Sequence, residues 1–173
     1  MRKVIAAINM TLDGYCDHTA AIADDELHQH YADLLSNAGT LLYGRITYQL
    51  MEYWQTVVKN PTGNKATDDF AVLMDNIPKI VFSHTLKNVD WKSATLATRD
   101  FKEVALELKQ QPGKDIFVGS PSLIVAATQL GLIDEYQISV QPIIEGKGLS
   151  LFNNMKNRVD LKLLETKTFG CGA

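Results

Sequence analysis

The chain has 173 residues, with 17 lysines and arginines against 20 aspartates and glutamates, and a formal net charge of −3 at pH 7. This length predicts a single domain over residues 1–173, because a domain of this size buries roughly 70% of the surface that its unfolded chain exposes. The slightly acidic balance argues against a nucleic-acid-binding protein, which has to neutralise many phosphates.

The two cysteines and the first ten residues indicate a cytoplasmic protein. Cys16 and Cys171 lack the spacing of a zinc site or a redox pair, so we expect free thiols in a reducing compartment. The opening segment, MRKVIAAINM, has basic residues before an apolar run that is too short for a signal peptide, and it predicts a first strand instead. No stretch approaches the roughly 20 apolar residues of a membrane-spanning helix.

Apolar runs of strand length alternate with segments of helical periodicity. The first helix is expected to be capped by Asp25 and stopped by Gly39. The sequence predicts buried strands at 3–9, 40–44, 78–85 and 115–119, a weaker strand at 93–98, and helices at 26–38, 45–54, 66–77, 100–111 and from Pro121 onward.

The last third of the chain changes pattern. Residues 135–144 and 158–169 alternate polar and apolar side chains, which is typical of antiparallel strands. Together with the preceding strands and helices, this predicts a three-layer α/β/α fold, with a mainly parallel sheet and an antiparallel C-terminal pair.

Small, hydroxyl and cationic residues follow three of the predicted parallel strands. Such strands place ligands at their carboxyl ends, so these residues are expected to converge on one phosphorylated ligand. They are Gly44, Arg45 and Thr47 after the second strand, Ser83, His84 and Thr85 after the third, and Gly119, Ser120, Pro121 and Ser122 after the strand at 115–119.

Each of these strand ends allows two interpretations. Ser120 suits a helix N-cap and Pro121 the first helical position, so the segment is either a capped crossover helix or an anion site formed by the amides of the first turn. Gly119 favours the second because it permits close approach of a ligand. Arg45 suits a phosphate partner but also a surface position, and the segment 83–85 also suits an ordinary turn.

Four segments together resemble a known family. MTLDGY, LYGRITYQ, KIVFSHT and DIFVGSPSLIVAATQLGLIDEYQISVQPIIEGKGLSLF occur here in the order and spacing of the dihydrofolate-reductase-like family that includes the C-terminal reductase domain of the riboflavin-biosynthesis deaminase-reductase. The resemblance covers nearly the whole chain and is greatest to the small stand-alone bacterial members.

The resemblance implies an NADPH-dependent reductase that transfers a hydride to a pyrimidine, such as 5-amino-6-(5-phosphoribosylamino)uracil, or to a pterin. It implies cofactor contacts at Ala7, Leu12, Gly14, Gly44, Arg45, Thr47, Ser83, His84, Thr85, Gly119, Ser120, Pro121, Ser122 and Leu123, with Asn9 beside the substrate. Two positions depart from the family pattern. Ser120 stands where a second glycine is usual, and His84 stands where a basic residue is common.

The proton donor is less evident. Asp13 lies in the loop beside the expected nicotinamide, although an Asp-Gly pair after a strand is also typical of a turn. Asp25 is a candidate substrate-binding carboxylate, although acidic residues at a helix start also complement its dipole. Met51, Met74 and Trp54 are interpreted as core or interface residues. No metal-binding motif is present.

Two further interpretations concern the whole molecule. A non-catalytic nucleotide-binding module that retains the fold is the alternative to a reductase. A homodimer is expected, because Tyr136, Ile138 and Val140 in a long alternating strand could bury an apolar face against a second copy.

Overall fold

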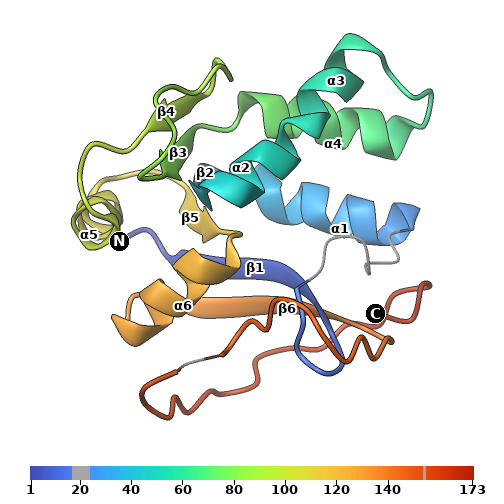
Figure 1. The fold of residues 1–173 in the computed structure, drawn as a ribbon. Helices are drawn as coiled ribbons and strands as arrows, with labels where there is room; N and C mark the ends of the chain where they lie inside the picture. The colour runs from blue at the N-terminus through green and yellow to red at the C-terminus, as the bar shows by residue number, and fades with distance from the viewer. Residues whose placement is uncertain (17–23, 154) are drawn as a thin grey trace.

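The computed structural model describes residues 1–16, 24–153 and 155–173. Strands and helices alternate along most of the chain (Figure 1). The elements are β1 (Val4–Thr11), α1 (Asp25–Ser36), β2 (Ala38–Gly44), α2 (Arg45–Met51), α3 (Tyr53–Lys59), α4 (Lys65–Asn76), β3 (Lys79–Phe82), β4 (Ala94–Leu96), α5 (Phe101–Gln110), β5 (Asp115–Val118), α6 (Pro121–Gln129) and β6 (Glu135–Gln141).

The strands form one sheet in the order β4-β3-β2-β5-β1-β6, and every neighbouring pair is parallel. Ala6 of β1, for example, lies opposite Val118 of β5 on one side and Tyr136 of β6 on the other. Because all strands run the same way, their carboxyl ends lie along one edge of the sheet. β5 lies between β2 and β1, which brings the ends of three strands distant in sequence next to one another.

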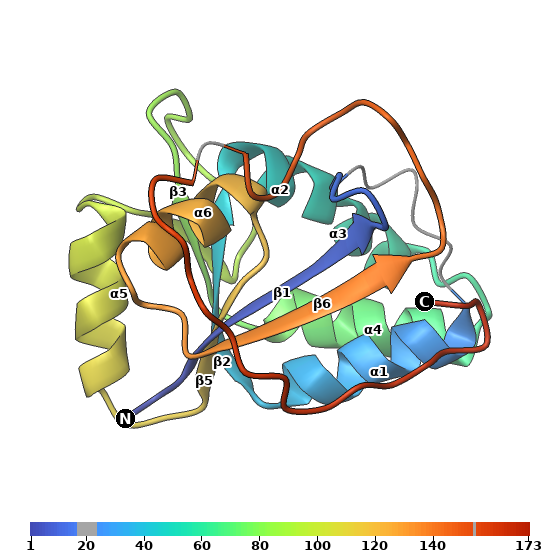
Figure 2. The same ribbon diagram turned by 90° about the horizontal axis from the view of Figure 1, so that it is seen from below.

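Helices cover both faces of this sheet, which confirms the predicted α/β/α layers (Figures 1 and 2). Successive strand residues face opposite cores, as a pleated strand requires. Ile5 and Phe117 belong to the core beneath α1–α4, whereas Val4 and Val118 belong to the core beneath α5 and α6.

The prediction that the last third of the chain forms an antiparallel pair of strands is wrong. β6 is parallel to β1, and the two strands point the same way in Figure 2. The cause is the position of α6, because a strand that follows a crossover helix returns to the sheet in the original direction. β6 ends before Pro142, which has no N–H for the ladder. No residue in the described range 155–173 belongs to a strand, although Leu161 and Leu163 are exposed there in alternation.

The ends of α1 also differ from the prediction. Asp24, and not Asp25, is the N-cap, and its carboxylate accepts a hydrogen bond from the backbone N–H of Leu27 at 2.8 Å. Gly39 lies within β2 instead of stopping the helix. A Cβ atom at Gly39 would lie 2.9 Å from the carbonyl oxygen of Lys114, so close backbone packing is what requires glycine there.

Lys79 of β3 is a buried cation with several partners. Its ammonium group donates to the carbonyl oxygens of Met74 and Ile77 at the end of α4 and to the hydroxyl of Ser93. It also lies 3.9 Å from the centre of the Trp91 ring. Burial lowers the pKa of Lys79 from its ordinary 10.5 to about 8, while the nearby Asp75 carboxylate acts in the opposite direction.

We predict that the free energy of unfolding rises with pH above about 8 through the contribution of Lys79. In that range the unfolded chain still binds a proton that the folded protein has released, so increasing pH favours the folded state. Lys79→Met should remove this rise and destabilise the fold by about 1–3 kcal/mol for each buried acceptor left without a donor. Urea unfolding between pH 7 and pH 9.5 measures both effects.

Lys102→Met, at an exposed position of α5, is the matched control and should leave the pH profile unchanged. Identical pH dependence in the wild type and in Lys79→Met would contradict the prediction.

Candidate functional site

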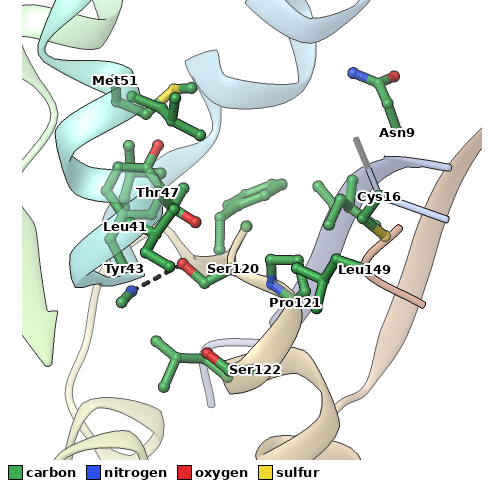
Figure 3. A pocket seen from close by; sticks show the side chains of 18 of the residues that line it. Asn9, Cys16, Leu41, Tyr43, Thr47, Met51, Ser120, Pro121, Ser122 and Leu149 are labelled. Carbon is green, nitrogen blue, oxygen red and sulfur yellow. Dashed lines mark hydrogen bonds between the residues drawn. The ribbon is translucent and has the colours of Figure 1, made fainter. Parts of the chain in front are cut away.

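A cavity of about 1180 Å³ lies at the carboxyl ends of β1, β2, β3 and β5, and Figure 3 shows part of its lining. The structure brings together at this cavity most of the residues singled out in the sequence: Ala7, Asn9, Gly44, Arg45, Thr47, Ser83, His84, Thr85, Gly119, Ser120, Pro121, Ser122 and Leu123. Leu12, Asp13, Gly14 and Asp25 are not part of this lining.

A hydrogen bond joins two of the strand ends. The hydroxyl of Ser120 accepts from the backbone N–H of Gly44 at 2.8 Å, and Figure 3 marks this bond with a dashed line. Ser120 is only 2% exposed. The residue that follows β5 is therefore fixed against the residue that ends β2.

This bond changes the predicted role of Ser120. Ser120 is the N-cap residue of α6 by position, with Pro121 first in the helix, but its side chain makes no capping hydrogen bond. By contrast, Asp24, Asn64 and Asp100 each accept from a first-turn amide of their own helix. The start of α6 thus faces the cavity without a side-chain cap, which is a helix end suited to an anion.

Arg45 adds positive charge beside this helix start. It follows Gly44 directly, is exposed, and donates through Nη1 to Oε1 of Gln49 at 3.1 Å. Gly44 lies close to both serines of α6, since a Cβ atom on it would be 3.6 Å from the Ser122 hydroxyl and 3.7 Å from the Ser120 hydroxyl. Backbone amides, hydroxyls and a guanidinium therefore meet at one end of the cavity.

The third strand end forms a turn. The hydroxyl oxygen of Ser83 accepts from the backbone N–H groups of Thr85 and Leu86 at 3.1 and 3.0 Å. This is the local turn geometry of a serine side chain, and it leaves the exposed side chains of His84 and Thr85 at the rim of the cavity.

Two loops form a further wall. The backbone N–H of Cys16 donates to Leu149, and that of Leu151 donates to Gly14, at 2.8 and 2.9 Å. Tyr15 and Ser150 form an isolated antiparallel bridge between the same loops. Residues 148–151 consequently line the cavity beside Cys16.

Asp13 stabilises this pair of loops. Its carboxylate accepts from the hydroxyl of Thr11 at 2.7 Å and from the amides of Gly146 and Glu145 at 2.8 and 3.2 Å. These hydrogen bonds, led by that of Thr11, lower the pKa of Asp13 and keep it ionised. An ionised carboxylate outside the cavity lining does not support the expectation that Asp13 donates a proton.

Asp25 likewise has another partner. It lines a separate hollow of about 360 Å³ between α1 and α4, where its carboxylate accepts from the side-chain amide of Asn64 at 3.1 Å. The structure gives Asp25 a contact between two helices and does not place it with the residues of the main cavity.

The inner part of the cavity was missed by the sequence analysis. Tyr31 of α1 donates its hydroxyl to Oδ1 of Asn9 at 3.0 Å, and burial raises the pKa of Tyr31 strongly. The other inner residues are mainly aromatic or apolar and come from α1–α4: Leu27, His28, Leu35, Leu50, Met51, Trp54, Phe70 and Met74. The sequence pattern predicts Met51, Met74 and Trp54 to be core or interface residues, whereas the structure places them in the cavity lining. Their helical spacing shows which side of each helix turns inward, but it is the same whether that side meets a filled core or a cavity.

No helix in the described ranges is long and apolar enough to cross a membrane. Within the same ranges, no three histidine, cysteine or acidic side chains gather closely enough to hold a metal ion.

The chain is an α/β domain with a parallel sheet covered on both faces and a large cavity at the carboxyl edge of that sheet, which is where such folds bind their ligands. The chain matches the family described as the RibD C-terminal domain over residues 2–173 and belongs to that family. It is 32% identical to the uncharacterized protein YyaP of Bacillus subtilis (strain 168), over 99% of this chain and 91% of that protein.

Solved structures share the fold. A putative riboflavin biosynthesis protein from Shewanella sp. PV-4 has a TM-score of 0.72 at 17% identity, over 99% of this chain and 94% of that one. A diaminohydroxyphosphoribosylaminopyrimidine deaminase/5-amino-6-(5-phosphoribosylamino)uracil reductase from Thermotoga maritima has a TM-score of 0.59 at 18% identity. This chain is covered over 94% of its length, but it spans only 51% of the Thermotoga protein.

We predict that Ser120→Ala destabilises the protein by about 1–3 kcal/mol, because the amide of Gly44 loses its acceptor in a largely buried setting. Ser122→Ala is the matched control, since Ser122 is exposed two residues further along the chain. Urea unfolding monitored by circular dichroism measures both. Equal stability of the two variants would show that the bond between the strand ends contributes nothing.

Proposed function

We propose that this protein is an NADPH-dependent reductase of a small heterocyclic substrate, acting by hydride transfer. The observation that carries the proposal is the uncapped start of α6 beside Arg45, at the end of the cavity where Ser120 joins β2 to β5. Membership of the RibD C-terminal domain family supports the same activity, since the Thermotoga relative carries the name of a reductase.

The residues present fit a dinucleotide. Amides at a helix start, hydroxyls and a guanidinium are the donors that phosphates prefer. The cavity, at about 1180 Å³, exceeds the roughly 300–1,000 Å³ typical of one small-molecule site, so it has room for a cofactor and a substrate together. We assign the pyrophosphate to residues 119–123 with Gly44 and Thr47, and the adenosine end to residues 83–85.

The nicotinamide end would lie against β1, beside Ala7 and Asn9. NADPH supplies the hydride, and the protein orients the substrate and excludes water. Tyr31 fixes the side chain of Asn9 through its hydroxyl, which leaves the amide N–H groups of Asn9 to orient the substrate. Tyr31, Tyr43 and His28 are lining residues that carry exchangeable protons, and the hydroxyl of Tyr43 donates to the sulfur of Met74 at 3.5 Å.

One observation favours the alternative, a nucleotide-binding module without turnover. No aspartate or glutamate belongs to the cavity lining formed by the described residues. Among the described lining residues, the groups that can supply a substrate proton are hydroxyls, imidazoles and the thiol of Cys16. Oxidation of NADPH, followed at 340 nm with pyrimidine and pterin substrates, distinguishes the two, because the module would bind the cofactor without consuming it.

Arg45→Ala should weaken NADPH binding by about 10- to 100-fold, because a hydrogen bond to a charged group is worth roughly 1.5–3 kcal/mol. A larger loss for NADPH than for NADH would place Arg45 at the 2′-phosphate, and equal losses would place it at the shared pyrophosphate. Calorimetric titration with both cofactors makes the comparison.

Arg99→Ala serves as the control, since Arg99 pairs with Glu107 away from the cavity. Wild-type protein that binds neither cofactor at millimolar concentration would refute the proposed function.

We also propose that the protein is a homodimer. β6 is an edge strand with a neighbour on one side only, and exposed apolar side chains gather in the same part of the chain. They include Val140, Ile144, Leu149, Leu161, Leu163 and Leu164. A second copy is the partner that would cover such a face symmetrically.

Light scattering at micromolar concentration should therefore give about twice the 19.2 kDa mass of one chain. Leu161→Lys combined with Leu163→Lys should shift the mass toward that of a monomer. A wild-type mass of one chain at these concentrations would contradict the dimer.

A further inference from the structure

The two halves of the cavity differ in chemistry. The half at the strand ends carries hydroxyls, Arg45 and His84. The inner half, between the sheet and α1–α4, is lined by rings and apolar chains, among them Leu27, Met51, Trp54 and Phe70. Phosphate recognition and ring recognition are thus separated along one cavity.

Positive charge is confined to the strand-end half. Arg45 is the only lysine or arginine in the lining that the described residues form. The segment 17–23, with the sequence DHTAAIA, contains no lysine or arginine in any case. If Arg45 binds a phosphate of the cofactor, a phosphate on a second ligand has no cationic side chain to meet. Burying an unpaired dianion is strongly unfavourable.

The inner half has the kind of lining that suits a flat ring. Trp54 and Phe70 lie edge to face with centroids 4.6 Å apart, and the His28 ring lies perpendicular to Trp54 at 6.4 Å. Asn9 and Tyr31, joined by their 3.0 Å hydrogen bond, add an amide and a hydroxyl group to the same lining. Aromatic walls with a few hydrogen-bonding groups select a heterocycle by its faces and its polar edge.

We propose that the substrate is a neutral, planar heteroaromatic compound that carries no phosphate. It binds in the inner half, with its faces against the aromatic side chains and its polar edge toward Asn9, Tyr31 and His28. The proposal rests on the proposed function, because it assumes that the cofactor occupies the strand-end half. It separates this chain from the Thermotoga relative, whose name specifies a phosphoribosylated uracil.

The deciding experiment uses a matched pair of ligands on wild-type protein saturated with NADPH. The pair is 5-amino-6-(ribosylamino)uracil with and without its 5′-phosphate, measured by calorimetry beside a panel of unphosphorylated pterins and pyrimidines. We expect at least one unphosphorylated compound to bind below 1 mM, and the phosphate to improve affinity by less than about threefold.

A site with a cation for the phosphate would instead favour the phosphorylated form by about 10- to 100-fold. That result overturns the proposal, as does a failure of every unphosphorylated compound to bind. Either outcome with NADPH still bound refutes only this inference, whereas a protein that does not bind NADPH refutes the proposed function itself.

A pair of variants tests the location. Trp54→Leu should weaken the unphosphorylated ligand about tenfold, the scale of an aromatic stacking contact, and leave NADPH affinity within about twofold. Phe169→Leu is the control, since it also removes a ring, and Phe169 packs against His30 outside the lining. Equal losses in the two variants, or an equal loss of NADPH affinity in Trp54→Leu, would contradict the assignment. The comparison of the two ligands uses wild-type protein, so it still tests the proposal if a variant fails to fold.

Discussion

The hydrogen bond from the amide of Gly44 to the hydroxyl of Ser120 is the contact on which the rest of the site depends. It joins β2 to the residue after β5, and these strands are neighbours in the sheet although they are far apart in sequence. Because the hydroxyl is used there, it does not cap α6, and the helix start stays available to a ligand. One bond thus sets both the shape of the cavity edge and its electrostatic character.

The carboxylates near the cavity serve the architecture. Asp13 holds the turn at 145–146, Asp24 caps α1, and Asp25 reaches across to α4. Glu26 accepts from the backbone of Gly170 at 2.9 Å and so holds the C-terminal segment against α1. These carboxylates stabilise loops and helix ends, and the polar groups in the described part of the cavity lining are hydroxyls, imidazoles, amides and the guanidinium of Arg45.

The two faces of the sheet are packed differently. Beneath α5 and α6 the core is made of compact aliphatic side chains, such as Ala105, Ile124 and Ala127, which fill the layer. Beneath α1–α4 it contains large rings, such as Trp54 and Phe70, and the cavity extends among them. The inner half of the cavity therefore lies on the aromatic side of the sheet, whereas the strand-end half also borders α6.

The sequence by itself determined the alternation of strands and helices, the three layers, and the strand ends that meet at the cavity. The signals behind these features are local: continuous apolar runs, helical periodicity and residues such as Pro121 each specify the structure of a short segment. It also located Asp13 in a loop next to β1, but it left the partner of that carboxylate open. Tertiary structure alone decided that β6 is parallel, since strand direction depends on how α6 crosses the sheet. It likewise decided that Ser120 binds Gly44 and that Trp54 faces a cavity, because each depends on a partner brought close only by folding.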